Sequence, residues 1–232
     1  STAFTGIGCP EIASAAMRAC MGGEIFKFID GIERGHVARS VMFSHCPASR
    51  LQVDILRWLP TASRSRISLV PASKLRAAIF DRRVHLDLTG EYFAPHSFGD
   101  CHVAGPPCVD ISPMGAGRRE SGPSMMCLYV WARALRETAP MLVIIENVPR
   151  FPVSLLRSLF EDIYHIDWTY VEALDFGSPG RRRRLYAVMT LRGKVALGRR
   201  MADLHGVCTS VFQTRRSWEL LYCLEGVDDG FS

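Results

Sequence analysis

Short apolar runs alternate along the chain with stretches in which apolar residues recur at helical spacing. This alternation is typical of an α/β protein, in which strands and helices follow one another. Residues 141–145 form the clearest buried strand and residues 125–138 the clearest helix. The remaining predicted strands are 3–4, 41–43, 83–86, 99–104, 167–173 and 185–189, and the remaining predicted helices are 10–17, 51–58 and 153–160.

The length of 232 residues is enough for one large domain, or for one domain with a small appendage. Apolar residues make up 48% of the chain, yet no run reaches the ~18 apolar residues of a membrane-spanning helix. The first residues also lack the basic and then apolar pattern of a secretion signal. We therefore expect an intracellular protein without a membrane partner. Because the sequence does not begin with methionine, we also expect it to be part of a longer protein.

The eight cysteines show neither a CxxC pair nor the spacing with histidines that zinc sites have, so we expect no metal. Most of them should be reduced thiols packed as small apolar side chains. The net charge is +5, and only three of the 28 basic residues are lysines. Arginine binds phosphates and base edges through paired hydrogen bonds, so this bias is compatible with nucleic acid. A GC-rich coding sequence would explain it equally well.

The stretch from Gly105 to Cys108 carries the clearest sign of chemistry. It follows a predicted strand end, where one glycine and two prolines form a tight turn with a thiol at its tip. A cysteine in this place is available for attack on a substrate. Glu146 follows the strand 141–145, and an acid there can take up the charge that develops when a thiolate adds to an electron-poor ring. Taken alone, Glu146 is more simply an acid that caps the next turn.

Two other positions have both a ligand-binding and a structural interpretation. Phe4 to Gly8 lies between a predicted strand and a predicted helix. Glycines there let the backbone approach a ligand, but many such turns carry glycines for packing alone. Asp87 follows a predicted strand and is otherwise a helix cap or a turn residue.

Four consecutive arginines, Arg181 to Arg184, enter the predicted strand 185–189. The alternation of a strand places Arg182 and Arg184 on one face. Two neighbouring guanidinium groups repel each other unless an anion or a carbonyl-rich ligand lies between them. A solvated basic edge that discourages aggregation is the simpler alternative.

The order of these stretches resembles the cytosine-C5 DNA methyltransferase family. The chain runs from FxGxG through an aspartate after a strand, GPPC and ENV to the arginines before the last strand. The stretch GPPCVDIS is similar to the family's GPPCQxFS, and DFGSPGRRRRLY is similar to its DYGxPQxRxRxF. The resemblance covers roughly residues 1–190, and its order is specific although each part alone is weak.

This resemblance implies a Rossmann-like S-adenosylmethionine-dependent methyltransferase fold. The fold would have a mixed, mostly parallel seven-stranded sheet with helices on both faces. Residues 1–190 would form the cofactor-binding and catalytic domain. Residues 191–232 would be an extension of uncertain structure, a truncated or degenerate recognition region.

The resemblance also implies roles for single residues. Cys108 would add to C6 of a cytosine flipped out of the DNA duplex, and Glu146 would bind the N3/N4 edge of that base. Arg184, with Arg182, would hold O2 and the neighbouring phosphate. The residues implied to bind S-adenosylmethionine are Phe4, which would stack on the adenine, Gly6, Ile7 and Gly8 along the methionine part, Asp87 at the adenine amino group, Leu88 beside it, and Pro107.

The chain departs from the family's pattern at several positions. The acidic ribose ligand after the second strand is absent, and Cys46 stands in its place. Cys9 replaces a glycine of the first turn, Val109 replaces the glutamine after the nucleophile, and Gly180 replaces the first residue of QxRxR. Residues 190–232 show no clear counterpart of the recognition domain or of the closing helix.

Three functions therefore stay open at this point. The leading hypothesis is a DNA cytosine-C5 methyltransferase, which would be nuclear if its source is eukaryotic. A second hypothesis keeps the chemistry but takes tRNA as substrate, as one branch of the family does. The third is an inactive, truncated relative that only binds cofactor or nucleic acid.

Overall fold

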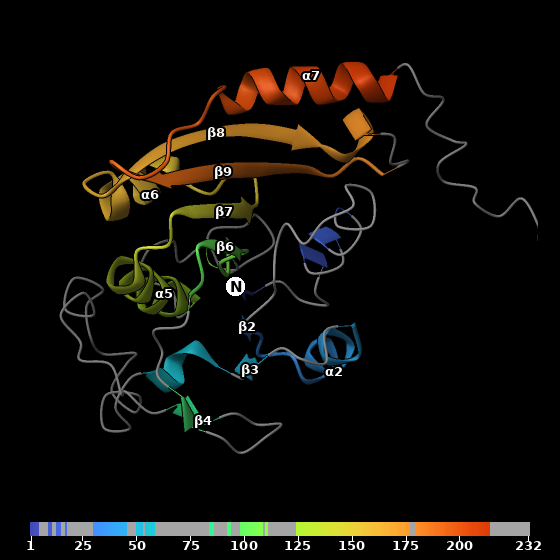
Figure 1. Cartoon of the computed structure of the whole chain (residues 1–232). Helices are drawn as coiled ribbons and strands as arrows, with labels where there is room; N and C mark the ends of the chain where they lie inside the picture. Colours follow the sequence, from blue (N-terminus) through green and yellow to red (C-terminus); the bar gives the residue numbers. More distant parts are fainter. Residues whose placement is uncertain are drawn as a thin grey trace, which may run out of the picture.

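A seven-stranded sheet forms the centre of the computed structural model, with its strands in the order β3-β2-β1-β6-β7-β9-β8 (Figure 1). Neighbouring strands from β3 to β7 are parallel, and β9 runs antiparallel between β7 and β8. The strands are β1 Thr2–Ala3, β2 Asp30–Ile32, β3 Arg50–Gln52, β6 Cys101–Ala104, β7 Leu142–Asn147, β8 Tyr164–Glu172 and β9 Arg183–Leu191. The structure describes residues 1–4, 9–10, 13–14, 17, 30–45, 50–52, 54–58, 84–85, 92–93, 98–108, 110, 124–176 and 180–213.

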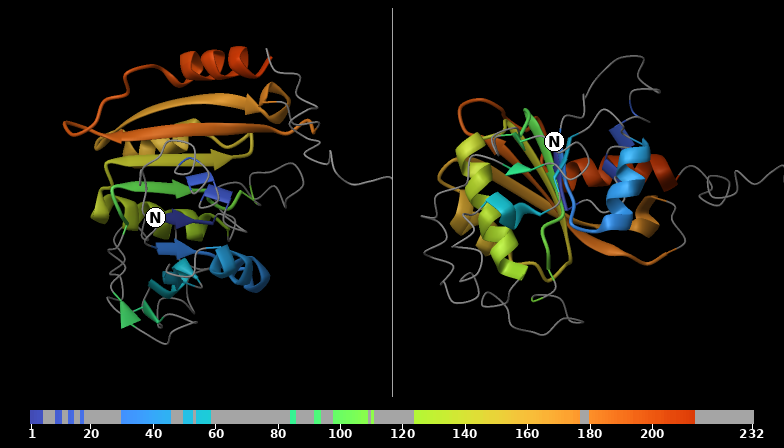
Figure 2. Two further views of the ribbon diagram at one scale, coloured as in Figure 1. Left: turned by 45° about the vertical axis from the view of Figure 1, so that its right-hand side comes forward. Right: turned by 90° about the horizontal axis from the view of Figure 1, so that it is seen from below.

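Helices cover both faces of this sheet. Figure 2 shows α5 and α6 on one face and α2 and α7 on the other. A separate two-stranded sheet pairs β4 with β5. The bounds are α2 His36–His45, α5 Ser124–Thr138, α6 Val153–Phe160 and α7 Met201–Gln213 for the α-helices, η1 Ile55–Trp58 and η4 Ala173–Phe176 for the 3₁₀ helices, and β4 Val84–His85 and β5 Tyr92–Phe93 for the small sheet.

The alternation of β7 decides which of its side chains enter the core. Val143, Ile145 and Asn147 are buried, while Ile144 and Glu146 point to the opposite face. The buried face packs on α5 and α6, where Trp131 and Phe160 meet edge to face with their ring centroids 5.7 Å apart. Because α5 and α6 cover only the face of Val143, Ile145 and Asn147, Glu146 on the opposite face of the sheet can take part in a site.

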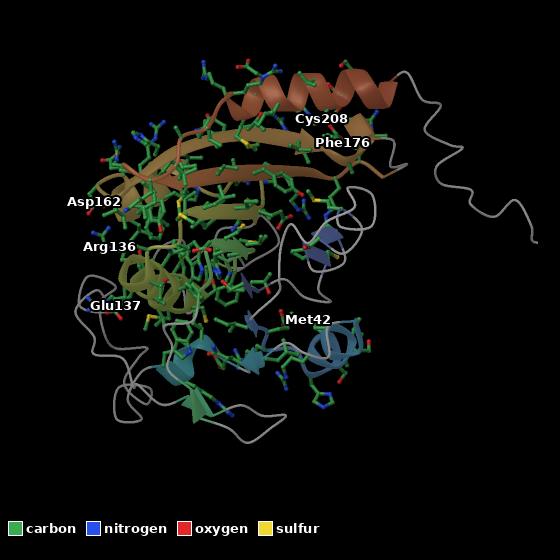
Figure 3. The ribbon with its side chains drawn as sticks, in the orientation of Figure 1. Met42, Arg136, Glu137, Asp162, Phe176 and Cys208 are labelled. Atoms are coloured by element: carbon green, nitrogen blue, oxygen red, sulfur yellow. The ribbon has the colours of Figure 1, made fainter. Side chains whose placement is uncertain are left out.

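The ends of α5 and α6 are tied together by an arginine and an aspartate. Arg136 donates hydrogen bonds to the carbonyl of Leu159, at 2.6 Å, and to both carboxylate oxygens of Asp162. Figure 3 shows Arg136 and Asp162 at the same end of the molecule. This pair lies at the amino ends of the parallel strands, away from the turn that carries Cys108.

Helix α7 packs on β8 and η4. The Asp167 carboxylate of β8 accepts a hydrogen bond of 2.6 Å from the Met201 backbone amide at the first residue of the helix. His205 lies 3.0 Å from Asp175, and its ring contacts Phe176 of η4 beneath the helix (Figure 3). Residues 201–213 of the predicted C-terminal extension are therefore helical and packed on the sheet.

The predicted fold class is confirmed, and the predicted strands 99–104, 141–145, 167–173 and 185–189 correspond to β6, β7, β8 and β9. The prediction of a second strand at 41–43 is wrong, because these residues lie in α2, where Met42 is buried (Figure 3). A three-residue apolar run cannot distinguish a strand from the buried side of a helix. The second strand is β2.

The prediction of a helix at 51–58 is also wrong. Its first residues belong to β3, and only Ile55–Trp58 form a short 3₁₀ helix. The prediction of a third sheet strand at 83–86 is wrong as well, because Val84–His85 pairs with β5 outside the seven-stranded sheet. The third strand of the main sheet is β3.

Candidate functional site

The turn after β6 is pressed between the end of β1 and the end of β7. The Gly105 amide donates a hydrogen bond of 3.0 Å to the Ala3 carbonyl. A Cβ atom on Gly105 would lie 3.1 Å from the Phe4 carbonyl oxygen and 3.6 Å from Oε2 of Glu146. Glycine is therefore needed here because backbone and carboxylate approach from two sides. The Glu146 carboxylate thus lies against the turn that carries Cys108.

Asn147 ties the turn after β6 to the end of β7. Its buried side chain donates a hydrogen bond of 3.0 Å from Nδ2 to the Pro106 carbonyl, and its Oδ1 accepts one of 2.9 Å from the Val148 amide. One side chain thus ties the turn that carries Cys108 to the strand that carries Glu146. Asn147 had no predicted role, although it stands inside the ENV stretch.

Glu146 and Arg184 form an ion pair, with 2.9 Å between Arg184 Nε and Glu146 Oε1. Tyr186 is the direct partner of Glu146 in the β7–β9 pair, and Arg184 precedes it by two residues on the same face. Arg182, just before β9, is exposed. The predicted catalytic residues Cys108, Glu146 and Arg184 therefore meet at one edge of the sheet, with Arg182 at its rim.

The charges of this site act on the Cys108 thiol. Burial raises the pKa of Cys108, and the negative charge of Glu146 raises it further. The Val148 amide and the Arg184 guanidinium act in the opposite direction. Burial, with the charge of Glu146 in second place, thus favours the protonated, weakly nucleophilic thiol, and loss of the Glu146 charge would lower the pKa of Cys108 again.

Tyr186 is a further residue of this cluster that the sequence analysis did not single out. Burial raises the pKa of its phenol, and Glu146 and Cys9 raise it further, while Arg182 and Arg184 lower it. The phenol therefore lies within electrostatic reach both of the Glu146–Arg184 pair and of the turn after β1. Tyr186 ends the stretch DFGSPGRRRRLY, where the family's pattern has phenylalanine, but its pairing with Glu146 could not be predicted without the sheet.

The end of β1 carries an unusual backbone conformation at Phe4. Its φ of 58° is rare for a residue other than glycine and marks local strain. The Phe4 amide donates a hydrogen bond of 2.8 Å to the Ile32 carbonyl of β2, which holds the chain in this conformation. Pro107, in the turn after β6, is partly buried. Gly6, Ile7 and Gly8 lie outside the described residues.

Two acidic residues follow the second and third strands of the sheet. Glu33 follows β2, and its Oε1 accepts a hydrogen bond of 2.7 Å from the Gly35 amide. Asp54 follows β3, and its Oδ1 accepts one of 2.9 Å from the Leu56 amide. Arg34 Nε lies 3.8 Å from Asp54 Oδ2, so the two turns are neighbours. These turns lie at the same edge of the parallel sheet as Cys108.

This placement corrects the expectation that the position after the second strand holds Cys46. That expectation depended on a strand at 41–43, and the residue that follows the true second strand is Glu33. A signal existed in the sequence, because Ile25, Phe26, Phe28 and Ile29 form an apolar run before Asp30. Asp87 and Leu88 lie outside the described residues.

A separate cavity of about 710 Å³ lies at the opposite edge of the sheet. It is lined by the first residues of β8, the end of β9 and the connection to α7, with Arg157, Arg192, Arg199 and Arg200 among its side chains. It shares no residue with the cluster around Cys108. Within the described part of the chain, no helix is long and apolar enough to cross a membrane, and no group of histidine, cysteine and acidic side chains could hold a metal ion.

The chain is similar in sequence to known methyltransferases. The family model described as C-5 cytosine-specific DNA methylase matches residues 87–206, a little over half of the chain. The Type II methyltransferase M1.HgaI of Avibacterium volantium is 27% identical in an alignment of 135 positions that covers 50% of this chain and 36% of that protein.

Two solved structures share the fold at low identity. The Dnmt2 methyltransferase of S. pombe has a TM-score of 0.54 and 15% identity, over 88% of this chain and 54% of that chain. A putative DNA modification methyltransferase encoded within an E. coli prophage has a TM-score of 0.53 and 20% identity, over 85% of this chain and 48% of that chain. The chain thus spans about half or less of the length of the relatives it matches.

Proposed function

Because the chain belongs to the C-5 cytosine-specific DNA methylase family, we propose that it carries the catalytic part of an S-adenosylmethionine-dependent methyltransferase acting on C5 of cytosine in DNA. The observation that supports this most directly is the cluster of Cys108, Glu146 and Arg184. These three residues come from three separate segments of the chain. The ion pair of 2.9 Å between Glu146 and Arg184 and the effects of both charges on the Cys108 pKa indicate that they are neighbours. A thiol, an acid and a guanidinium are the groups that addition to a cytosine ring requires.

In this proposal the base itself controls the nucleophile. Cytosine would enter flipped out of the duplex, because C6 cannot be reached inside the stack. Glu146 would then share its charge with the N3/N4 edge of the base, so that its effect on the Cys108 pKa weakens. Arg184 would continue to favour the thiolate and would hold O2, while Arg182 at the rim would contact the neighbouring phosphate. The thiol would therefore become reactive when a substrate is present.

The covalent steps follow from this arrangement. The Cys108 thiol would lose its proton to solvent, and its sulfur would form a bond to C6 while the double bond between C5 and C6 opens. The displaced electron pair moves into the ring and gives C5 enamine character, so that C5 can react. When bound, S-adenosylmethionine supplies an electrophilic methyl group carried on a sulfonium. After the methyl group has joined C5, the C5 proton would leave to solvent and the bond between Cys108 and C6 would break, which restores the aromatic ring.

The residues at the ends of β1, β2 and β3 fit the adenosine part of this cofactor. Carboxylates accept hydrogen bonds from hydroxyl and amino groups, and Glu33 and Asp54 stand in neighbouring turns. We assign the ribose hydroxyls to Glu33 and the adenine amino group to Asp54, in place of Asp87. Phe4, with its strained backbone at the end of β1, would contact the adenine ring, and Gly6, Ile7, Gly8 and Pro107 would line the methionine part.

Transfer of a labelled methyl group from S-adenosylmethionine to duplex DNA tests this function, with Cys108→Ser as the inactive control. A duplex carrying 5-fluorocytosine sharpens the test, since fluorine cannot leave as the proton does and the protein should stay covalently joined to the DNA. Small RNA in a parallel reaction decides between the two substrates. Cofactor binding without transfer to either would support an inactive relative instead.

A further inference from the structure

We propose that Arg39 is a positioning residue that fixes the turn between β2 and α2 and thereby presents Glu33 to the cofactor. This inference depends on the proposed function, because it assigns the ribose hydroxyls to Glu33. Arg39 belongs to the first half of α2, and its side chain points back toward the turn that precedes the helix.

The guanidinium of Arg39 binds the backbone of this turn directly. Nη1 donates hydrogen bonds to the carbonyl of Glu33, at 3.1 Å, and to the carbonyl of Arg34, at 2.6 Å. The residue is only 8% exposed, which is unusual for an arginine. Burying a guanidinium is costly unless its donors are used, and the hydrogen bonds to these two carbonyls offset part of that cost.

Glu33 is also held from its other side. Its amide donates a hydrogen bond of 3.0 Å to the Gln52 carbonyl of β3, and Gln52 is itself buried with its side chain bonded to Trp58 at 2.6 Å. The backbone of Glu33 is thus fixed between β3 and the Arg39 guanidinium. A turn that is fixed in advance loses less conformational entropy when a ligand binds.

The carboxylate of Glu33 is oriented by the same turn. Its Oε1 accepts the Gly35 amide at 2.7 Å, and a Cβ atom on Gly35 would lie 3.2 Å from that oxygen. Gly35 also accepts, through its carbonyl, a hydrogen bond of 2.9 Å from the Arg39 amide. Arg39 and Gly35 therefore both orient the Glu33 carboxylate. Arg39 fixes the backbone of the turn, while Gly35 donates its amide to the carboxylate and has no side chain that would crowd it.

The test measures binding of S-adenosylhomocysteine by calorimetry to the wild-type chain and to Arg39→Gln, Glu33→Gln and the double variant. We expect Arg39→Gln to weaken binding about tenfold, the effect of one lost hydrogen bond to a charged group. Because Arg39 acts through Glu33, the double variant should bind no more weakly than Glu33→Gln alone. Arg192→Gln is the matched control, since Arg192 also donates to a backbone carbonyl, that of Glu161, but at the opposite edge of the sheet.

Hydrogen exchange at the Gly35 amide provides a readout that needs no cofactor, and Gly35→Ala provides a second variant if Arg39→Gln folds poorly. Faster exchange at Gly35 in Arg39→Gln, and weaker binding in Gly35→Ala, would support the proposal. Additive losses in the double variant, or unchanged exchange at Gly35, would overturn it. If the wild-type chain binds no S-adenosylhomocysteine but Gly35 still exchanges faster in Arg39→Gln, the proposed function fails while the positioning role of Arg39 stands.

Discussion

Arg184 of β9 pairs with Glu146 of β7 at 2.9 Å, and both side chains are about a third exposed. A pair this accessible to water adds little to the stability of the fold. Its importance lies in the Cys108 thiol, on which the two charges act with opposite sign. The pair therefore links the reactivity of the nucleophile to whatever binds Glu146.

Glu146→Gln should make Cys108 more reactive toward small reagents while it impairs catalysis. Glu146 raises the pKa of Cys108, so removal of its charge should move alkylation by iodoacetamide to lower pH. The same change removes the group that stabilises charge on the base, and methyl transfer should fall by roughly 100-fold or more. Mass spectrometry of the peptide that contains Cys108 measures the first effect, and single-turnover transfer measures the second.

Arg184→Gln is the matched variant, and it should shift the pKa of Cys108 in the opposite direction. Arg184 lowers the pKa of Cys108, so its loss should move the alkylation profile to higher pH. If both variants moved the profile in the same direction, the charges of this pair would not be what controls Cys108.

Asn147→Leu should destabilise the fold and loosen the site together. The substitution keeps the size of the side chain but removes the hydrogen bond to the Pro106 carbonyl, which lies 41 residues away in the sequence. A buried carbonyl left without its donor costs about 1–3 kcal/mol of unfolding free energy. Urea denaturation measures this loss. Ser158→Ala on α6 removes a hydrogen bond to the carbonyl three residues earlier and should change the unfolding free energy far less.

The grouping of Cys108 with Glu146 could be predicted from the sequence because its signals are local. A thiol after Gly105-Pro106-Pro107 and an acid directly after an apolar strand are visible without the sheet, and the family's order relates them. Asn147 and Arg39 could not be predicted in the same way. Their roles depend on hydrogen bonds to carbonyl groups that the chain brings near only when it is folded.

The edge of the sheet formed by β1, β2 and β3, to which we assign the cofactor, was the less predictable part of the fold. Strands β1, β2 and β3 have only two or three residues each, so their periodicity carries almost no information. The buried Met42 made an apolar run in α2 look like a strand, and this error displaced the expected position of the ribose ligand to Cys46. The parallel pairing of β1 with β2 identifies Glu33 as the residue that follows the second strand.

The stability of the fold should fall in mildly acidic solution because of His102. Its ring is fully buried, and Nε2 accepts a hydrogen bond of 2.9 Å from the Trp131 indole, so the ring is neutral. Burial lowers the pKa of His102 well below its usual value of 6.5. The unfolded chain therefore binds a proton that the folded chain does not, and stability present above about pH 6.5 is lost as the pH falls below it.

Denaturation at several pH values, with wild-type protein and His102→Gln, measures this effect. The wild type should lose up to ~1.4 kcal/mol per pH unit below about pH 6.5 through this one group. Glutamine keeps an acceptor for Trp131 but does not titrate, so the variant should show a smaller slope. An equal slope in wild type and His102→Gln would remove His102 as the cause.

Asp54→Asn should weaken binding of S-adenosylhomocysteine, whereas Asp87→Asn should not. Asp54 follows the third strand of the main sheet, beside the turn of Glu33, while the strand before Asp87 pairs outside that sheet. The Leu56 amide donates to Oδ1 of this side chain, so an amide bound in the same way would present its NH₂ group to the adenine amino group, and we expect a loss of about tenfold in affinity. Calorimetry on both variants compares the two positions directly. A loss at Asp87 with normal binding at Asp54 would return the adenine contact to Asp87 and would mean that the order of strands does not decide where this cofactor binds.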